Sequence, residues 1–224
     1  MTGSGTQDVA GRRTIVVTGA TGGVGRGIAI ACGEAGWSVW IAARREREGL
    51  AVAEEVTTAG GVGHFVACDA GDPTSVEHAI ATVLAQDGRI DGVCHNATSG
   101  LSPVPVALSE VSLADFQDHV NVALRAAWAL ARSCHDALAA TRGSMLILTS
   151  EAGFEGKAKL PPYAGVKGAQ RGFARALARE WGRDGIRVNA LAPLASTPAM
   201  ETAFELDPAM ASRVLNRNPL GRLG

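Results

Sequence analysis

Short apolar runs alternate with longer segments of helical character along almost the whole chain, and this alternation restricts the fold more than any other feature. Several runs are almost continuously apolar, which is typical of parallel strands buried on both faces. A repeated strand–helix–strand order places such strands in one parallel sheet that helices cover on both sides. We therefore predict an α/β fold with a Rossmann-type doubly wound sheet in three layers, α/β/α. The six expected strands are residues 14–18, 38–42, 63–68, 90–95, 144–149 and 186–191.

The segments between these runs carry ordinary helix signals. A first helix is expected at about residues 23–35, because Gly36 is a natural residue just after a helix C-terminus. Another should begin at Asp72 and Pro73, since aspartate caps a helix N-terminus well and proline suits the first helical position. Two longer helices are expected at about residues 113–139 and 163–181.

Composition narrows the classes of function. A chain of 224 residues, 46% of them hydrophobic, can build one sizeable core. The net charge of −1 and the lack of a basic run argue against nucleic acid or an anionic membrane as partner. The polar N-terminal segment does not have the pattern of a signal peptide. No run approaches the roughly 18 consecutive apolar residues that a membrane helix needs. The four cysteines are widely spaced, so we expect neither a metal site nor disulfides. We expect a cytoplasmic protein with a disordered tail, residues 1–11, and a single domain, residues 12–224.

Glycines cluster where the first strand meets the first helix. Glycine lets the backbone turn sharply and approach a pyrophosphate, while the helix beyond offers free N–H groups and the positive end of its dipole. A cluster at this junction predicts a dinucleotide site, and the competing interpretation is a tight turn without a ligand. The expected contacts are Thr18, Gly19, Thr21, Gly23, Val24 and Gly25.

The residues after the second expected strand bear on which dinucleotide is bound. An acidic side chain there binds the ribose 2′-hydroxyl of NAD, whereas an arginine accommodates the 2′-phosphate of NADP. Here Ala43 stands where the acid would, and Arg44 and Arg45 follow. A guanidinium matches phosphate in charge and shape, so we predict NADP(H) rather than NAD(H), with Arg44 as the main contact and Arg45 as a second. The competing interpretation is that both arginines begin a solvated helix with Glu46 and Glu48.

One helix carries a pair of residues suited to proton transfer. Tyr163 is the only tyrosine, and Lys167 follows four residues later, so both side chains lie on one helix face. Hydride transfer to a ketone needs a proton donor at the carbonyl oxygen, the reverse needs a base, and a nearby ammonium stabilises the phenolate. Alone, Tyr-x-x-x-Lys is a common coincidence. Ser150, however, ends the fifth expected strand, at the edge of the sheet where ligands of open α/β folds bind, and its hydroxyl can hold the substrate oxygen.

The spacing Thr-Gly-x-x-x-Gly-x-Gly from Thr18, taken with these residues, resembles the classical short-chain dehydrogenase/reductase (SDR) family from about residue 14 to the end of the chain. The resemblance implies that Ser150 holds the substrate oxygen and that Tyr163 transfers the proton. It also implies that Lys167 acts on Tyr163, and that both contact the nicotinamide ribose. Asn121 matches the family's fourth catalytic member, which kinks its helix and holds a water that links the lysine to solvent.

The resemblance extends to further cofactor contacts, with some departures. Asp69 matches the residue that hydrogen-bonds the adenine ring, although it also suits a turn. Asn96 matches part of the family's Asn-Asn-Ala-Gly motif, in which His95 and Thr98 replace the first Asn and the Gly. His95 could be read as a catalytic base, but we favour a packed or hydrogen-bonded core residue.

The end of the chain departs most. Pro193 is followed by Leu194 where the family has glycine, and Thr197, expected at the nicotinamide carboxamide, comes one residue early. The family's last helix and seventh strand would follow Gly224 and are not in this sequence. Residues 198–216 resemble substrate-covering helices, or else a helix packed permanently on the core.

Relatives associate through the helices that carry Asn121 and Tyr163, so a homodimer or homotetramer is expected. The same apolar positions also suit covering the chain's own sheet. They are Ala123, Leu124, Ala127, Leu130, Ala169, Phe173 and Leu177.

The sequence thus predicts an NADP(H)-dependent oxidoreductase that reduces a ketone or a 3-oxoacyl group to a secondary alcohol, or catalyses the reverse, with Tyr163 as general acid/base and no metal. The alternative is a non-catalytic NADP(H)-binding regulatory protein, because a fold does not fix a function. Residues 98–107 and 151–162, which mix apolar and cationic side chains, are expected to line the substrate.

Overall fold

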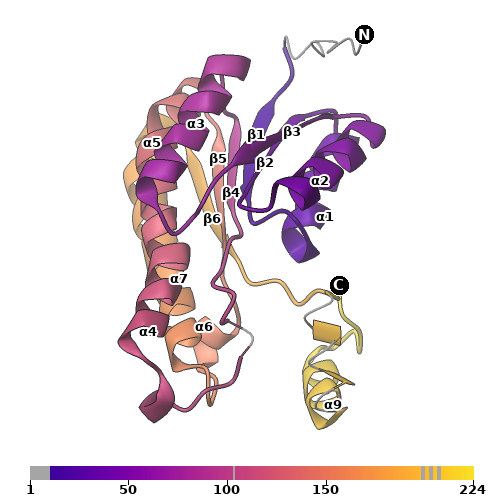
Figure 1. The fold of residues 1–224 in the computed structure, drawn as a ribbon, viewed down its shortest axis with the longest axis vertical. Helices are drawn as coiled ribbons and strands as arrows, with labels where there is room; N and C mark the ends of the chain where they lie inside the picture. Colours follow the sequence, from indigo (N-terminus) through magenta and orange to yellow (C-terminus); the bar gives the residue numbers. More distant parts are fainter. Residues whose placement is uncertain (1–10, 103, 198–199, 202–203, 206–207) are drawn as a thin grey trace.

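One parallel sheet forms the centre of the molecule (Figure 1). The computed structural model describes residues 11–102, 104–197, 200–201, 204–205 and 208–224, so nearly all of the expected N-terminal tail lies outside the described residues. The sheet has six strands in the order β3-β2-β1-β4-β5-β6, every neighbouring pair parallel. The predicted fold and its strands are confirmed, with ends that shift by a residue or two. The strands are β1 (Thr14–Thr18), β2 (Ser38–Ala43), β3 (Val62–Ala67), β4 (Gly92–His95), β5 (Ser144–Leu148) and β6 (Arg187–Leu191).

Helices cover both faces of this sheet, as Figure 1 shows. On one face, α1 (Gly23–Glu34) and α2 (Glu46–Thr58) bury an apolar cluster against β1 and β2. On the other face, α3 (Pro73–Asp87), α5 (Ala126–Thr141) and α7 (Pro161–Trp181) bury a larger cluster. The expected start of α3 is confirmed, since the Asp72 carboxylate accepts a hydrogen bond from the Thr74 N–H. Among the described residues, no helix has both the length and the apolarity to cross a membrane.

The chain changes direction across the sheet between β1 and β4, which lie side by side although far apart in sequence. Strands β1 to β3 extend one way from this point, and β4 to β6 extend the other way. In open α/β sheets, ligands bind outside the carboxyl ends of the strands at such a switch point. The segments that follow β1, β4, β5 and β6 all leave from this edge, so the fold by itself predicts where a site should lie.

The long helix expected at residues 113–139 is not continuous. It consists of α4 (Leu113–His119), a π-helical turn (Val120–Arg125) and α5. A π-turn takes up an extra residue and shifts the backbone carbonyls out of the α pattern, and such turns occur often at functional sites. Periodicity alone could not predict this interruption, because the apolar face of the helix continues through it.

Three further elements lie near the carboxyl edge. A short helix, α6 (Ala152–Glu155), follows β5, and a 3₁₀ turn (Leu108–Glu110) precedes α4. The helix expected in residues 198–216 is described as α9 (Pro208–Arg217), while residues 198–199, 202–203 and 206–207 lie outside the described part of the chain.

Helix α9 stands beyond the sheet edge rather than against the layers (Figure 1), and none of its described residues belongs to the buried core. Arg217 joins it to the segment after β5 through ion pairs with Glu151 (3.1 Å) and Glu155 (2.8 Å). The described part of α9 is therefore not packed permanently on the core.

Candidate active site

The glycine-rich turn packs directly against the end of β4. Gly19 has a φ of +66°, and a Cβ atom there would lie 2.8 Å from the Cα of Ala97. A Cβ atom at Gly25 would lie 2.5 Å from the amide nitrogen of Asn96 and 2.7 Å from the carbonyl oxygen of Gly19. Only glycine fits at these two positions, because a side chain would push the turn away from β4.

Hydrogen bonds hold the turn in this shape. The Asn96 amide donates to the Gly19 carbonyl oxygen (2.9 Å), and the Thr18 hydroxyl accepts from the backbone N–H groups of Asn96 and Ala97 (3.2 Å each). No side chain caps the N-terminus of α1, whose cap residue is Gly22. Its first N–H groups are therefore available to an anion, and the turn fits the pyrophosphate of a dinucleotide.

Two cationic side chains follow β2, beside this turn. The Arg45 guanidinium donates to the Thr21 hydroxyl (2.6 Å) and pairs with Glu48 (3.6 Å). Arg44 is exposed and makes no hydrogen bond or ion pair with another described residue. The interpretation that the arginines border a helix is also correct, because α2 begins at Glu46 directly after Arg45. The start of the helix leaves the Arg44 side chain exposed, so its contact with a phosphate stays a prediction.

The other predicted cofactor contacts lie around the same turn. The Asp69 carboxylate accepts from the Gly71 N–H (2.9 Å), which makes it a turn residue whose side chain remains exposed. The methyl group of Thr197 lies 3.8 Å from the position of a Cβ atom on Gly23. The segment from Pro193 to Thr197 therefore crosses the glycine-rich turn, and Val24 is half-buried in the first turn of α1.

Lys167 is held under Tyr163 at the start of α7. The Lys167 side chain is buried, and its ammonium donates to the carbonyl oxygen of Leu148 at the end of β5 (2.7 Å). It lies 5.7 Å from the centroid of the Tyr163 ring. Burial lowers the pKa of Lys167 to about 8, so the group still carries its charge at neutral pH. A positive charge at this distance stabilises a phenolate.

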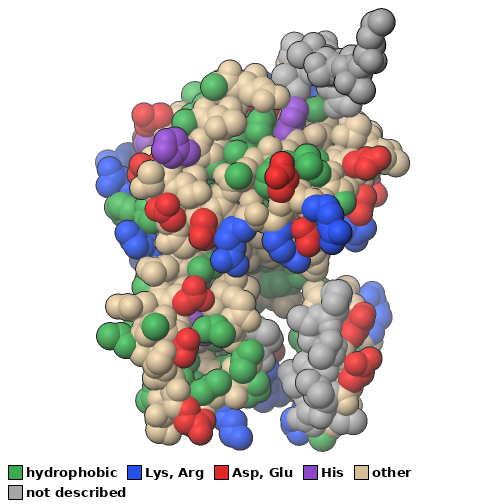
Figure 2. Space-filling view, viewed as in Figure 1, with side chains coloured by type: hydrophobic (Ala, Val, Ile, Leu, Met, Phe, Trp, Pro, Cys, Tyr) green, Lys and Arg blue, Asp and Glu red, His purple; other side chains and the backbone are tan. Residues whose placement is uncertain are grey.

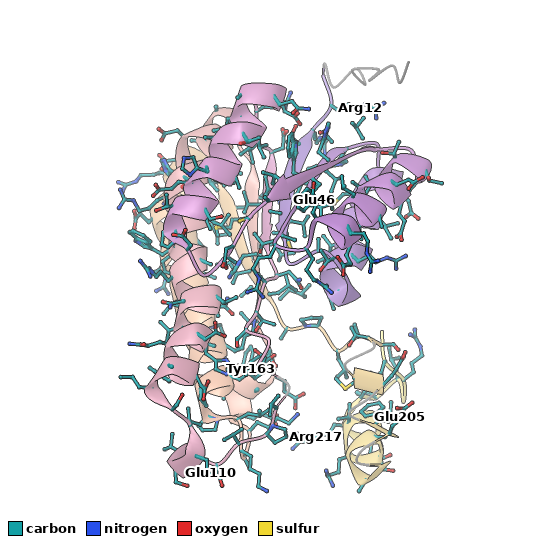
Figure 3. All side chains as sticks on the ribbon, viewed as in Figure 1. Arg12, Glu46, Glu110, Tyr163, Glu205 and Arg217 are labelled. Atoms are coloured by element: carbon teal, nitrogen blue, oxygen red, sulfur yellow. The ribbon has the colours of Figure 1, made fainter. Side chains whose placement is uncertain are left out.

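Ser150 reaches the same place from β5. Its hydroxyl accepts from the backbone N–H of Ala152 (3.2 Å), at the start of α6. A Cβ atom on Gly153 would lie 2.6 Å from the backbone of Lys167 and Gly168, so α6 packs closely against α7 at the lysine. Figure 3 shows Tyr163 in this region, at the N-terminal end of α7, where α4 and α6 contact it. The structure thus brings the segment of Ser150 to the helix of Tyr163 and Lys167.

Asn121 lies in the π-turn, whose backbone is tied to two other elements. The carbonyl oxygen of Ala123 accepts from the Gln170 amide on α7 (3.0 Å) and from Nε2 of His95 at the end of β4 (2.8 Å). Asn121 itself is half-buried. One carbonyl oxygen therefore connects the π-turn, helix α7 and strand β4.

His95 is a hydrogen-bonded core residue, as the sequence analysis favoured. His95 is fully buried. Its Nε2 carries the proton, because the Ala123 carbonyl oxygen that it contacts can only accept a hydrogen bond. Its Nδ1 therefore accepts a hydrogen bond from the Thr18 hydroxyl (3.0 Å). Burial, with a smaller contribution from the nearby Lys167 charge, lowers the pKa of His95 to about 4. The ring is neutral and links the glycine-rich turn to the π-turn. Sequence reasoning missed this role and that of Gln170, and the only signal was that His95 departs from the family motif.

The variant His95→Leu should lower the free energy of unfolding by about 2–3 kcal/mol, because it removes two buried hydrogen bonds and leaves the Thr18 hydroxyl without its acceptor. Thermal unfolding followed by circular dichroism measures the change. His78→Leu, an exposed position on α3, is the control and should shift stability by no more than about 0.5 kcal/mol. Equal melting temperatures for the two variants would show that the network does not stabilise the fold.

A hollow of about 400 Å³, open to solvent, adjoins Tyr163. Both segments expected to line the substrate contribute to it, residues 98–107 and 151–162. Helix α4 and the residues before it contribute a third wall, which the sequence analysis did not include. The signal was the i, i+4 spacing of Asp115 and His119, which share one face of α4. Val111 lines the cavity from just before the helix.

The chain is similar to known proteins in both sequence and fold. Residues 19–224 match a family model described as "Enoyl-(Acyl carrier protein) reductase". A 12alpha-hydroxysteroid dehydrogenase of Clostridium sp. is 31% identical over 211 residues, which cover 90% of this chain and 79% of the relative. A 2,5-dichloro-2,5-cyclohexadiene-1,4-diol dehydrogenase of Sphingobium indicum is 32% identical over 220 residues, 96% of this chain and 85% of the relative.

The fold is also similar to that of a solved structure. The crystal structure of an actinorhodin polyketide ketoreductase variant with NADPH matches with a TM-score of 0.84 at 27% identity, covering 95% of this chain and 85% of that one. These similarities lend no support to the non-catalytic alternative. The chain belongs to the short-chain dehydrogenase/reductase family, in its classical branch, and is an oxidoreductase that acts on CH–OH or C=O groups.

Proposed function

We propose that the protein reduces a carbonyl compound to a secondary alcohol with NADPH, or catalyses the reverse reaction, with Tyr163 as the general acid/base. The observation that carries the proposal is the buried Lys167 ammonium, fixed to the Leu148 carbonyl oxygen and 5.7 Å from the Tyr163 ring, beside the cavity. A buried lysine is costly unless its charge is used. Here the charge supports proton transfer at the phenol.

The residues would divide the chemistry as follows. In reduction, the Tyr163 hydroxyl donates a proton to the carbonyl oxygen, and in oxidation the phenolate takes the proton back. The Ser150 hydroxyl donates a hydrogen bond to the same oxygen and orients it. The bound dinucleotide supplies or accepts the hydride. Lys167 stabilises the phenolate by its charge, and the π-turn around Asn121 keeps the lysine side of the site in place.

The preference for NADP(H) rests on Arg44 and Arg45. The Thr21 hydroxyl fixes Arg45 beside the turn, Arg44 has no partner among the described residues, and Ala43 offers no carboxylate to repel a phosphate. Two guanidinium groups at this position favour the 2′-phosphate. The solved relative that contains NADPH is in keeping with this preference.

Arg44→Ala should weaken NADPH binding about 10- to 100-fold, because it removes one charge-assisted contact with phosphate. NADH binding, which lacks that contact, should change by less than about threefold. Titration of NADPH and NADH fluorescence measures both. Arg47→Ala, an exposed position one turn further along α2, serves as the control. A loss of the same size for NADH would mean that Arg44 does not read the 2′-phosphate.

For the substrate, we propose a cyclic ketone or secondary alcohol ahead of a 3-oxoacyl thioester. Both curated relatives above are named for hydroxyl groups on rings. The cavity beside Tyr163 is lined mainly by aliphatic side chains, which suit a compact apolar ring. Rates of NADPH oxidation with cyclohexanone, 2-decalone and an acetoacetyl thioester compare cyclic ketones with a 3-oxoacyl thioester. We expect faster turnover of the cyclic ketones, and faster turnover of the thioester would contradict this preference.

We also propose that two or four copies associate. Most of the apolar stripe expected to mediate contact covers the chain's own sheet, since Ala123, Ala127, Leu130 and Leu177 are buried in the monomer. The other three members of the stripe, Leu124, Ala169 and Phe173, are not buried. Larger apolar side chains are exposed nearby, namely Leu113 and Phe116 on α4 and Trp128 on α5, by 71%, 46% and 42%. Light scattering after size exclusion should give a dimer or tetramer, and Phe116→Asp should lower that mass, whereas a monomeric wild type would refute association.

A further inference from the structure

The cavity beside Tyr163 has a wall that contains an unsatisfied histidine. His119, the last residue of α4, lines the cavity and is only 6% exposed. Its Nδ1 is out of reach of solvent and has no hydrogen-bond partner, whereas Nε2 is not among the buried atoms and also bonds to no other described residue. Leaving a buried polar atom unpaired costs about 1–3 kcal/mol. Because Nδ1 is closed off, a ligand in the cavity would meet the ring at Nε2.

The rest of the cavity is apolar and carries balanced charge. Six of the lining side chains are aliphatic, and the charged ones are a single carboxylate, Asp115, and a single ammonium, Lys159. Opposite charges on one cavity cancel at a distance, so a charged substrate gains little by entering and would lose hydration. The aliphatic lining residues are Leu101, Val104, Val106, Val111, Leu160 and Pro162.

The two loops that line the cavity, which contain Val106 and Lys159, are held in a fixed position relative to each other. Lys159 has a φ of +61°, which is unusual for a residue with a side chain. Its carbonyl oxygen accepts from the Val106 N–H (2.7 Å), which ties the two lining loops together. Strained backbone of this kind persists where the surroundings hold it, often at ligand sites. The cavity is thus a built feature, lined by aliphatic side chains of both loops and by His119.

His119 offers a particular kind of contact. Burial lowers the pKa of His119, against the opposing charges of Asp118 and Asp115, so the ring is neutral at pH 7. A neutral imidazole has one N–H donor and one acceptor nitrogen. A hydroxyl group, or a carbonyl oxygen facing the N–H, satisfies it, whereas an alkyl group leaves it unpaired.

We infer that the cavity selects an uncharged, largely apolar substrate that carries a second oxygen function, a hydroxyl or a ketone remote from the reacting carbon, which hydrogen-bonds to His119. The inference rests on the proposed function, because it places the reacting carbon at Tyr163. His119 is then a residue that determines specificity at a distance from the chemistry. Figure 2 shows the lower end of the molecule, where hydrophobic side chains gather over α4 and its neighbouring loops.

The test compares ketones that differ only in the second oxygen. The wild type and His119→Phe are assayed with cyclohexanone against 1,4-cyclohexanedione, and with 2-decalone against decalin-2,6-dione. The two diones differ in the distance between their two oxygen atoms. Each dione value is halved for its two equivalent carbonyls. Taking the dione-to-monoketone ratio of kcat/KM in both proteins cancels the intrinsic reactivity of the ketones. His78→Phe, on the exposed face of α3, is the matched control.

For at least one pair, the ratio should be about tenfold higher in the wild type and in His78→Phe than in His119→Phe, as expected for one hydrogen bond. Equal ratios in wild type and His119→Phe for both pairs would overturn the inference.

Binding separates this inference from the proposed function. Saturation-transfer NMR on the Tyr163→Phe protein, with and without His119→Phe, measures dione and monoketone affinity without turnover. If the wild type reduces no ketone but His119 still favours the dione, the proposed function fails and the cavity assignment stands. If ketones are reduced but neither kinetics nor binding depends on His119, the cavity assignment fails alone.

Discussion

Tyr163→Phe should lower kcat for carbonyl reduction by about 10²- to 10⁴-fold, the usual contribution of a positioned acid or base. The change removes one oxygen atom and keeps the ring that lies 5.7 Å from the Lys167 ammonium. The proposed proton donor is then lost, and the proton must come from a group that is less well placed. Initial rates of NADPH oxidation with cyclohexanone measure the effect.

The fold and the cofactor site provide the control for this variant. NADPH affinity, measured by fluorescence titration, should change far less than kcat, and the melting temperature should stay within a few degrees. A variant that keeps more than a tenth of the wild-type kcat would show that another group transfers the proton. Ser150→Ala should then be examined, because its hydroxyl is the other oxygen that the structure brings to α7.

Gly25→Ala should weaken NADPH binding by about 10- to 100-fold. The added methyl group would lie 2.5 Å from the Asn96 amide and 2.7 Å from the Gly19 carbonyl oxygen, so either the turn or the end of β4 must move. Overpacking of this kind costs about 1–3 kcal/mol. The cost falls on the segment that we propose binds the pyrophosphate, and it is measured as the dissociation constant for NADPH.

Gly27→Ala is the matched control, since the same substitution two residues further along α1 meets nothing within 4 Å. An alanine in a helix is about 0.5–1 kcal/mol more stable than a glycine. Gly27→Ala should therefore bind NADPH like the wild type and melt slightly higher. If both variants bind equally well, close packing between the turn and β4 is not what shapes the cofactor site.

The parts of the fold that follow from local pattern could be predicted from the sequence. The β1 strand is a short run whose middle is fully apolar, and the Asp72–Pro73 start of α3 is a capping signal that acts within one turn. The glycines of the first turn were also sufficient to predict a close turn and a dinucleotide site there. At Gly19 and Gly25 the structure adds the reason, which is the distance to Asn96 and Ala97.

The connections between distant segments could not be predicted. The Ala123 carbonyl oxygen receives hydrogen bonds from His95 and Gln170 only because the π-turn exposes it, and nothing in the helical periodicity marks that turn. The burial of Lys167 and its bond to Leu148 depend on how α7 lies against β5. His119 has the spacing of a helix face, but which neighbour that face meets is decided by tertiary packing. Sequence therefore identified the candidate groups, and the structure supplied their surroundings.

Transfer of deuterium tests the central claim most directly. The wild-type protein is incubated with NADPH labelled with deuterium on one face or the other of C4 and with cyclohexanone, or with the best ketone from the panel, and the alcohol is analysed by mass spectrometry. The account predicts that one of the two labelled forms yields alcohol heavier by one mass unit with the label on the carbinol carbon, and that Tyr163→Phe slows formation of this product by the same factor of about 10² to 10⁴. NADPH that binds tightly while no labelled alcohol forms with any ketone would contradict it.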